Sequence, residues 1–138
     1  MIGEQAASID ELQRLLDETP FTRRLGLRVV GLDDGECTLE APFREDSERP
    51  GGVVSGQVFM TAADVAMWLA IKTRLGLEDG SVTADMSTVF LSAARQESIH
   101  CTANVLKWGR RLVVGVAECC NQAGQRLTHH TISYARTT

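Results

Sequence analysis

The sequence predicts an α+β fold in which an antiparallel sheet curls around one long central helix. Residues 54–75 have a helical pattern that is apolar or small on nearly every side, so other parts of the chain must enclose this helix. Two strand-like segments precede the helix and four follow it in a row. A sheet built from these strands and wrapped around the helix is the most economical arrangement of these elements.

The N-terminal residues 1–20 are predicted to form a lead-in and a short helix. Ser8 and Glu11 have the spacing of a capping box. Pro20 ends this segment, and its apolar face consists of Leu12, Leu15 and Leu16.

Two strands are predicted next, over residues 27–32 and 36–43. The sequence Asp33-Asp34-Gly35 between them is a strong hairpin signal. Residues 44–52 (REDSERPGG) are charged and then rich in Pro and Gly, which predicts a loop.

The long helix is predicted to run from Val54 to Leu75 and to end at Gly76. Four strands follow, over residues 81–91, 98–107, 111–121 and 126–134, with turns expected at 108–110 and 121–124. No repeat or second domain is visible, so residues 1–138 are expected to form one domain.

Composition excludes several classes of function. With 14 Lys and Arg against 18 Asp and Glu, the formal net charge is −4. No basic stripe is available to bind nucleic acid, and an anionic membrane surface is disfavoured. The apolar run 53–71 is nearly long enough to span a bilayer, but it contains Gln57 and Asp64, so we interpret it as a core helix.

The chain opens with no basic segment followed by an apolar one, so we expect no signal peptide and a cytoplasmic location. The four cysteines show no C-x-x-C spacing, and the adjacent Cys119 and Cys120 should face opposite sides of a strand. We expect reduced thiols. His129 and His130 also face opposite ways and no third ligand is evident, so no metal or cofactor is expected.

One ionisable residue, Asp64, lies in the middle of the oily helix. An ionised carboxylate buried without partners costs several kcal/mol, roughly, even after the protein relaxes. On a helix this residue forms one polar stripe with Gln57, Thr61 and Trp68. Two interpretations are open: Asp64 is part of a functional site, or it is held in a buried network or pairs with a core Arg.

The start of the same helix is a second candidate feature. Gly51 and Gly52 permit a sharp turn, and Ser55 is a good N-cap residue. The N–H groups of Gly56 and Gln57 then point out of the helix, where they can bind an anion or a developing oxyanion.

Geometry separates these two features within one chain. Gly56 and Asp64 are eight residues apart, which is about 12 Å along a helix. A general base must lie within about 3 Å of its proton, or one water away. Two chains with antiparallel helices would bring Asp64 of one close to Gly56 of the other, so a catalytic role for both predicts at least a dimer.

These residues form a pattern that resembles a known family. The run Gly52-Val53-Val54-Ser55-Gly56-Gln57, followed by Asp64, is similar to the hotdog-fold acyl-CoA thioesterases of the phenylacetate-degradation (PaaI-like) type, which usually show G-x-x-H-G-G and then an acidic helix residue. Further matches are Val82-Thr83-Ala84-Asp85-Met86, Phe90-Leu91-Ser92-Ala93 and Lys107-Trp108-Gly109-Arg110. The resemblance covers about residues 20–135 and implies the hotdog fold.

The resemblance also implies roles for individual residues. Asp64 would be the general base or nucleophile, the Gly56 N–H would polarise the thioester carbonyl, and Thr83 would place the water or the carboxylate. The hairpin that carries Arg110 and Arg111 would lie close to the CoA moiety.

The sequence departs from the family pattern at three positions. Ser55 replaces the His, Gln57 replaces the second Gly, and Arg49 stands where an Asn is frequent. Arg49 suits a substrate carboxylate or a CoA phosphate, and it could equally pair with Asp64.

The resulting hypothesis is a homo-oligomer, a dimer or a dimer of dimers, that hydrolyses acyl-CoA thioesters at a site in the dimer interface. Phe59, Met60, Met67 and Trp68 favour an aryl or medium-chain acyl group, and Ser55, Gln57 and Trp68 are counted with Arg49, Arg110 and Arg111 as substrate-binding candidates. A non-catalytic acyl-CoA-binding or sensing protein is the alternative. A hydratase or dehydratase is disfavoured, because no His lies within residues 1–99.

Overall fold

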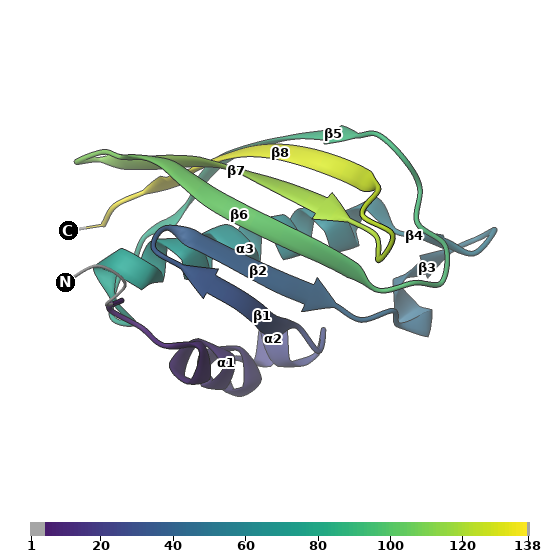
Figure 1. The fold of residues 1–138 in the computed structure, drawn as a ribbon, viewed down its shortest axis with the longest axis horizontal. Helices are drawn as coiled ribbons and strands as arrows, with labels where there is room; N and C mark the ends of the chain where they lie inside the picture. The colour runs from purple at the N-terminus through teal and green to yellow at the C-terminus, as the bar shows by residue number, and fades with distance from the viewer. Residues whose placement is uncertain (1–4, 138) are drawn as a thin grey trace.

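The computed structural model describes residues 5–137 and has the hotdog architecture. Helix α3 (Gly56–Leu75) lies along the concave face of a six-stranded antiparallel sheet, and the sheet curls over it (Figure 1). The strand order is β1-β2-β6-β7-β8-β5. The predicted α+β fold with a central helix is therefore confirmed.

The strands lie close to the predicted segments. They are β1 (Arg28–Asp33), β2 (Glu36–Ala41), β5 (Val82–Phe90), β6 (Ile99–Trp108), β7 (Leu112–Cys120) and β8 (Arg126–Ala135). The β1–β2 hairpin turns at Asp34-Gly35, and Gly35 has φ +69°, a conformation that favours glycine. Cys119 is buried while Cys120 is half-buried, so these neighbours do face opposite sides, and all four cysteines are free thiols.

The N-terminal helix α1 (Ile9–Glu18) begins with the predicted capping box. The Glu11 N–H donates to Ser8 Oγ, and the Ser8 N–H donates to Glu11 Oε1. Pro20 does more than end this segment, because it is the first residue of a four-residue helix, α2 (Pro20–Arg23). Proline suits that position, since the first helical N–H has no acceptor within the helix.

The segment predicted as a plain loop, residues 44–52, contains small elements. A 3₁₀ turn η1 (Glu45–Ser47) is followed by the two-residue strands β3 (Glu48–Arg49) and β4 (Val53–Val54), which pair with each other. Gly51 and Gly52 have φ values of +94° and +77° at the tip of this hairpin. The sequence signal for a turn was correct, and the short strands were missed because two residues show no periodicity.

The core forms between α3 and the inner face of the sheet. Its largest fully buried side chains include Leu39, Met67, Leu69, Ile71, Leu127 and Ile132. Gly115 of β7 permits a close approach of helix and sheet, because a Cβ there would lie 2.5 Å from Met67 Cε. No helix within residues 5–137 combines the length and apolar character needed to cross a membrane.

We expect Gly115→Ala to lower the free energy of unfolding by about 1–3 kcal/mol, because Met67 and the Asn104 carbonyl would have to move. Urea unfolding followed by circular dichroism measures the loss. Gly31→Ala is the matched control, since its Cβ would lie 3.4 Å from Thr38 Cβ, an ordinary contact. Equal effects of the two substitutions would show that close helix–sheet packing at Gly115 is not the cause.

Candidate active site

One face of α3 is left open by the sheet, and it is the predicted polar stripe. Gln57 is exposed, while Thr61, Asp64 and Trp68 are half-buried. Met67, which we expected among the acyl-binding residues, faces the core and is 0% exposed, so that part of the expectation is wrong. The stripe is therefore the surface of the helix that is available to ligands or to another chain.

Asp64 is held by two hydroxyl groups. Thr83 Oγ1 donates to Asp64 Oδ1 at 2.7 Å, and Tyr134 OH donates to the same oxygen at 2.7 Å. Among residues 5–137, no Arg or Lys forms an ion pair with Asp64. The expected alternative of a core Arg partner is thus not what this chain shows, and pairing of Asp64 with Arg49 is not seen within it.

Tyr134 is the neighbour that the sequence analysis missed. It lies on β8, 70 residues from Asp64 in the sequence, and is 3% exposed. Burial and then the nearby Asp64 carboxylate raise the pKa of Tyr134 far above its usual range. The raised pKa favours the protonated hydroxyl, which is the form that donates to Asp64.

At the helix start, the N-cap arrangement leaves one amide free. Ser55 Oγ accepts from the Gln57 N–H at 3.3 Å, as expected of an N-cap residue. The Gly56 N–H has no acceptor among residues 5–137. A Cβ on Gly56 would lie 3.2 Å from the ring of Phe90, so glycine permits β5 to pack against this first turn.

A hollow lined mainly by apolar side chains lies beside the free Gly56 N–H. It has a volume of about 380 Å³, and its lining residues include Val53, Phe59, Phe90 and Leu91. The rings of Phe59 and Phe90 meet edge to face with centroids 6.4 Å apart. Arg49 is the charged residue in this lining, so the structure brings Arg49 together with Gly56.

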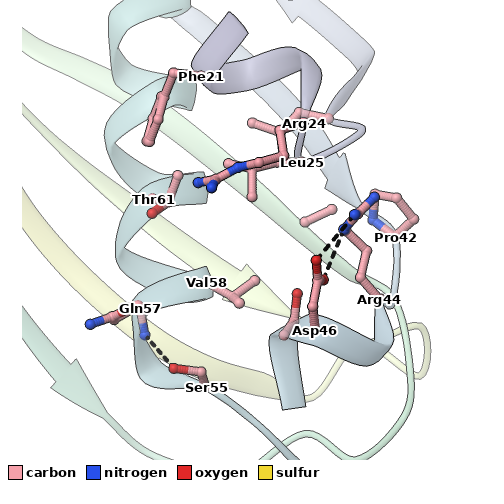
Figure 2. Close-up of a pocket in the computed structure, with 13 residues that line it drawn as sticks. Phe21, Arg24, Leu25, Pro42, Arg44, Asp46, Ser55, Gln57, Val58 and Thr61 are labelled. Atoms are coloured by element: carbon pink, nitrogen blue, oxygen red, sulfur yellow. Dashed lines mark hydrogen bonds and ion pairs between the residues drawn. The ribbon is translucent and has the colours of Figure 1, made fainter.

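A second cavity lies on another side of the same helical turn (Figure 2). Its volume is about 310 Å³, and Ser55, Gln57, Val58 and Thr61 of the helix region line it opposite α2. Arg24 lies on the α2 side, and Arg44 and Asp46 form an ion pair of 3.1 Å at the rim. Gly56 and Asp64 do not line this cavity.

The structure separates the remaining candidates into two groups. Arg110 and Arg111 are exposed in the β6–β7 turn. The β6–β7 turn follows Trp108, and the Arg74 guanidinium lies 4.4 Å from the centre of the Trp108 ring. Since Arg74 is near the C-terminal end of α3, the β6–β7 turn lies at the opposite end of the helix from Gly56. One chain therefore holds Gly56, Gln57 and Arg49 at one end, and Asp64, Thr83, Trp68 and the basic turn farther along.

The adjacent histidines are engaged by different partners. His130 is fully buried, and its ring nitrogens contact Thr88 Oγ1 at 2.8 Å and Thr128 Oγ1 at 2.7 Å. His129 lies on the other face of β8, 2.9 Å from Glu118. Each ring is thus accounted for by interactions within the sheet.

Comparison with known proteins places the chain in a family. A family model described as "Thioesterase superfamily" matches residues 51–128. A protein of Saccharolobus solfataricus named as a candidate esterase is 31% identical over 107 residues, which cover 78% of this chain and 71% of that protein.

Two solved structures show the same fold. Thioesterase superfamily member 2 of zebra fish superposes with a TM-score of 0.85 at 25% identity, covering 95% of this chain and 99% of that one. The PaaI protein of the E. coli phenylacetic acid degradation operon gives 0.82 at 16% identity, with 95% and 97% covered. At that identity the likeness to PaaI concerns the fold alone.

The raised pKa of Tyr134 predicts an alkaline loss of stability. A tyrosine ionises at about pH 10 in the unfolded chain but not in the folded one, so stability is full below pH 10 and falls above it. Between pH 9 and pH 11 we expect the wild type to lose about 1 kcal/mol more than Tyr134→Phe does. Urea titrations at both pH values measure this difference, and equal losses would contradict it.

Proposed function

Because the chain belongs to the thioesterase superfamily, we propose that it hydrolyses acyl-CoA thioesters to a free acid and CoA, at a site shared by two copies of the chain. Family membership makes it a thioester hydrolase; the acyl-CoA substrate and the PaaI-like subtype are the proposal. One observation carries it. The Gly56 amide, which has no acceptor in the described part of the chain, and a carboxylate held by hydroxyls lie about 12 Å apart along one helix.

In the proposed reaction, the Gly56 N–H donates to the thioester carbonyl oxygen and stabilises the negative charge that develops there. Asp64 of the other chain takes a proton from water as the water oxygen attacks the carbonyl carbon. Alternatively, the Asp64 carboxylate attacks that carbon itself, and water then hydrolyses the resulting mixed anhydride to release the acid and regenerate Asp64. In either case the C–S bond breaks and CoA leaves as a thiolate. A thiolate is a good leaving group, so the reaction needs no strong general acid.

The exposed edge of the sheet supports the shared site. Strand β5 is an edge strand, and it presents Val82, Val89 and Phe90, each more than half exposed. An exposed edge strand presents unpaired backbone groups that can pair with another chain. Because Thr83 of β5 contacts Asp64, this edge and the open face of α3 form one continuous surface.

Two-fold pairing along this surface would align the helices antiparallel. Each Asp64 would then approach the Gly56 of the other chain, and each basic turn with Arg110 and Arg111 would move toward the helix start of its partner. The exposed guanidinium groups suit the phosphates of CoA. This arrangement unites the two groups that one chain keeps apart.

The hollow beside Gly56 supports an aryl or medium-chain acyl group. Its volume of about 380 Å³ and its Phe59, Phe90 and Leu91 lining suit such a group. Arg49 at the same hollow suits an anionic substituent of the substrate or a CoA phosphate.

The catalytic assignment is tested by release of free thiol from a panel of aryl-CoA and acyl-CoA esters. We expect wild-type turnover on at least one of them and loss of turnover in Asp64→Asn. Gly56→Pro should lower kcat roughly 100- to 1000-fold because it deletes the N–H donor. Proline is tolerated at the first helical residue, and the ψ of 140° at Ser55 is compatible with a following proline.

Gly56→Ala is the matched control, because it keeps the N–H and adds the same Cβ beside Phe90. It should retain much more activity than Gly56→Pro. Full activity in Asp64→Asn would remove that residue from its role. Binding of acyl-CoA with no thiol release by the wild type would instead indicate a binding or sensing protein.

Mixed dimers test whether the site is shared. We expect Asp64→Asn and Gly56→Pro chains to be inactive separately and to regain activity when they are mixed, unfolded and refolded together. In such a heterodimer one of two sites combines an intact Asp64 with an intact Gly56, so it should reach about half of the wild-type kcat. The oligomeric state is checked by analytical ultracentrifugation.

If each site were contained within one chain, the mixture would stay inactive, because every chain carries one of the two substitutions. A monomer that retained full activity would also contradict the shared site.

A further inference from the structure

Two hydroxyl side chains, from one pair of opposed residues in the sheet, contact Asp64. Thr83 of β5 and Tyr134 of β8 are direct partners in the antiparallel pairing, and both point toward α3. The register of β5 shifts between Thr83 and Asp85, so a bulge follows immediately after this residue pair. Bulges commonly redirect a side chain next to an active site.

Both hydroxyls bind the same oxygen of the carboxylate. Thr83 Oγ1 and Tyr134 OH each lie 2.7 Å from Asp64 Oδ1. Tyr134 OH also lies 2.9 Å from the backbone carbonyl oxygen of Asp64. Asp64 Oδ2 accepts no hydrogen bond among residues 5–137, so the two carboxylate oxygens have different surroundings.

Tyr134 is well suited to hold a side chain in place. It is 3% exposed, so packing limits the movement of its ring. Its hydroxyl lies within hydrogen-bond distance of both the backbone carbonyl oxygen and Oδ1 of Asp64. Thr83, in contrast, lies on an exposed strand. The buried tyrosine is therefore the more rigid of the two donors.

We propose that Tyr134 is a positioning residue that fixes the Asp64 carboxylate by its Oδ1 atom, so that Oδ2 is the oxygen that reacts. This inference rests on the proposed function, since it assigns work to Asp64. Tyr134 itself does not touch the substrate. It acts by removing the rotational freedom of the carboxylate, and small misplacements of a reacting group can cost as much as about 100-fold in rate.

The test compares Tyr134→Phe with the wild type by steady-state thiol release. We expect kcat to fall roughly 10- to 100-fold with KM nearly unchanged, because ground-state binding of acyl-CoA does not use the hydroxyl. Thr83→Val should have a smaller effect of the same kind, and Thr83→Ser, which keeps the hydroxyl, should restore most of the rate.

Ile132→Val is the matched control for lost stability. Ile132 is fully buried on the same face of the same strand, and this substitution removes a methyl group but no donor. We expect it to lower the free energy of unfolding and to leave kcat unchanged. A loss of kcat in Ile132→Val equal to that in Tyr134→Phe would overturn the positioning role.

A variant that carries both Asp64→Asn and Tyr134→Phe tests whether Tyr134 affects the rate through Asp64. If Tyr134 works through Asp64, adding Tyr134→Phe to Asp64→Asn should cause no further loss of rate in single-turnover measurements at high enzyme concentration. A full additional 10-fold loss would contradict the inference.

The remaining outcomes distinguish the two proposals. Full activity in Asp64→Asn would end the proposed function, whereas loss of activity in Asp64→Asn with wild-type kcat in Tyr134→Phe would end only the role of Tyr134.

Discussion

The structure depends on burying a helix that is apolar on nearly every side. A six-stranded sheet curls over α3 (Figure 1), and it leaves open the helix face that carries Asp64, which contacts Thr83 of the edge strand β5. Gln57, Thr61 and Asp64 of α3 lie on this face. The buried polar residues nearer the C-terminal end of α3, Lys72 and Thr73, are instead hydrogen-bonded within the chain. The need to enclose one helix therefore determines where any chemistry carried by that helix must occur.

The same constraint divides the candidate site. The rise of a helix fixes the separation of residues eight positions apart, so Gly56 and Asp64 are held about 12 Å apart along α3. The exposed edge of β5 runs next to this open face and carries large apolar side chains. A fold that isolates two complementary halves beside an unpaired edge is suited to completion by a second copy of the chain.

The sequence was informative wherever side chains repeat with a regular period. Six long strands, α1 and α3 were predicted because alternation and helical spacing extend over many residues. The strand order, with β5 at the edge and β6 next to β2, was not predictable, because it depends on how the sheet closes around α3. Short elements such as α2 and β3 carry too few residues for a period.

Asp64 and Gly56 were proposed as site residues from the helix pattern, and the family resemblance added Thr83; the structure shows Asp64 and Thr83 in contact. Tyr134 was missed because 70 residues separate it from Asp64. A signal did exist: alternation along β8 places this tyrosine on the buried face with Ile132, and a buried hydroxyl needs a partner. Only the strand order shows that this partner is the carboxylate.

The hydrogen-bond partners of Asp64 are consistent with the catalytic role that we propose for it. A half-buried carboxylate must be stabilised, and an Arg partner would do so by neutralising its charge. Two neutral hydroxyls stabilise it while the site stays anionic, and they occupy only Oδ1. The two neutral donors therefore stabilise the carboxylate within the fold and leave it with the negative charge that the proposed reaction uses.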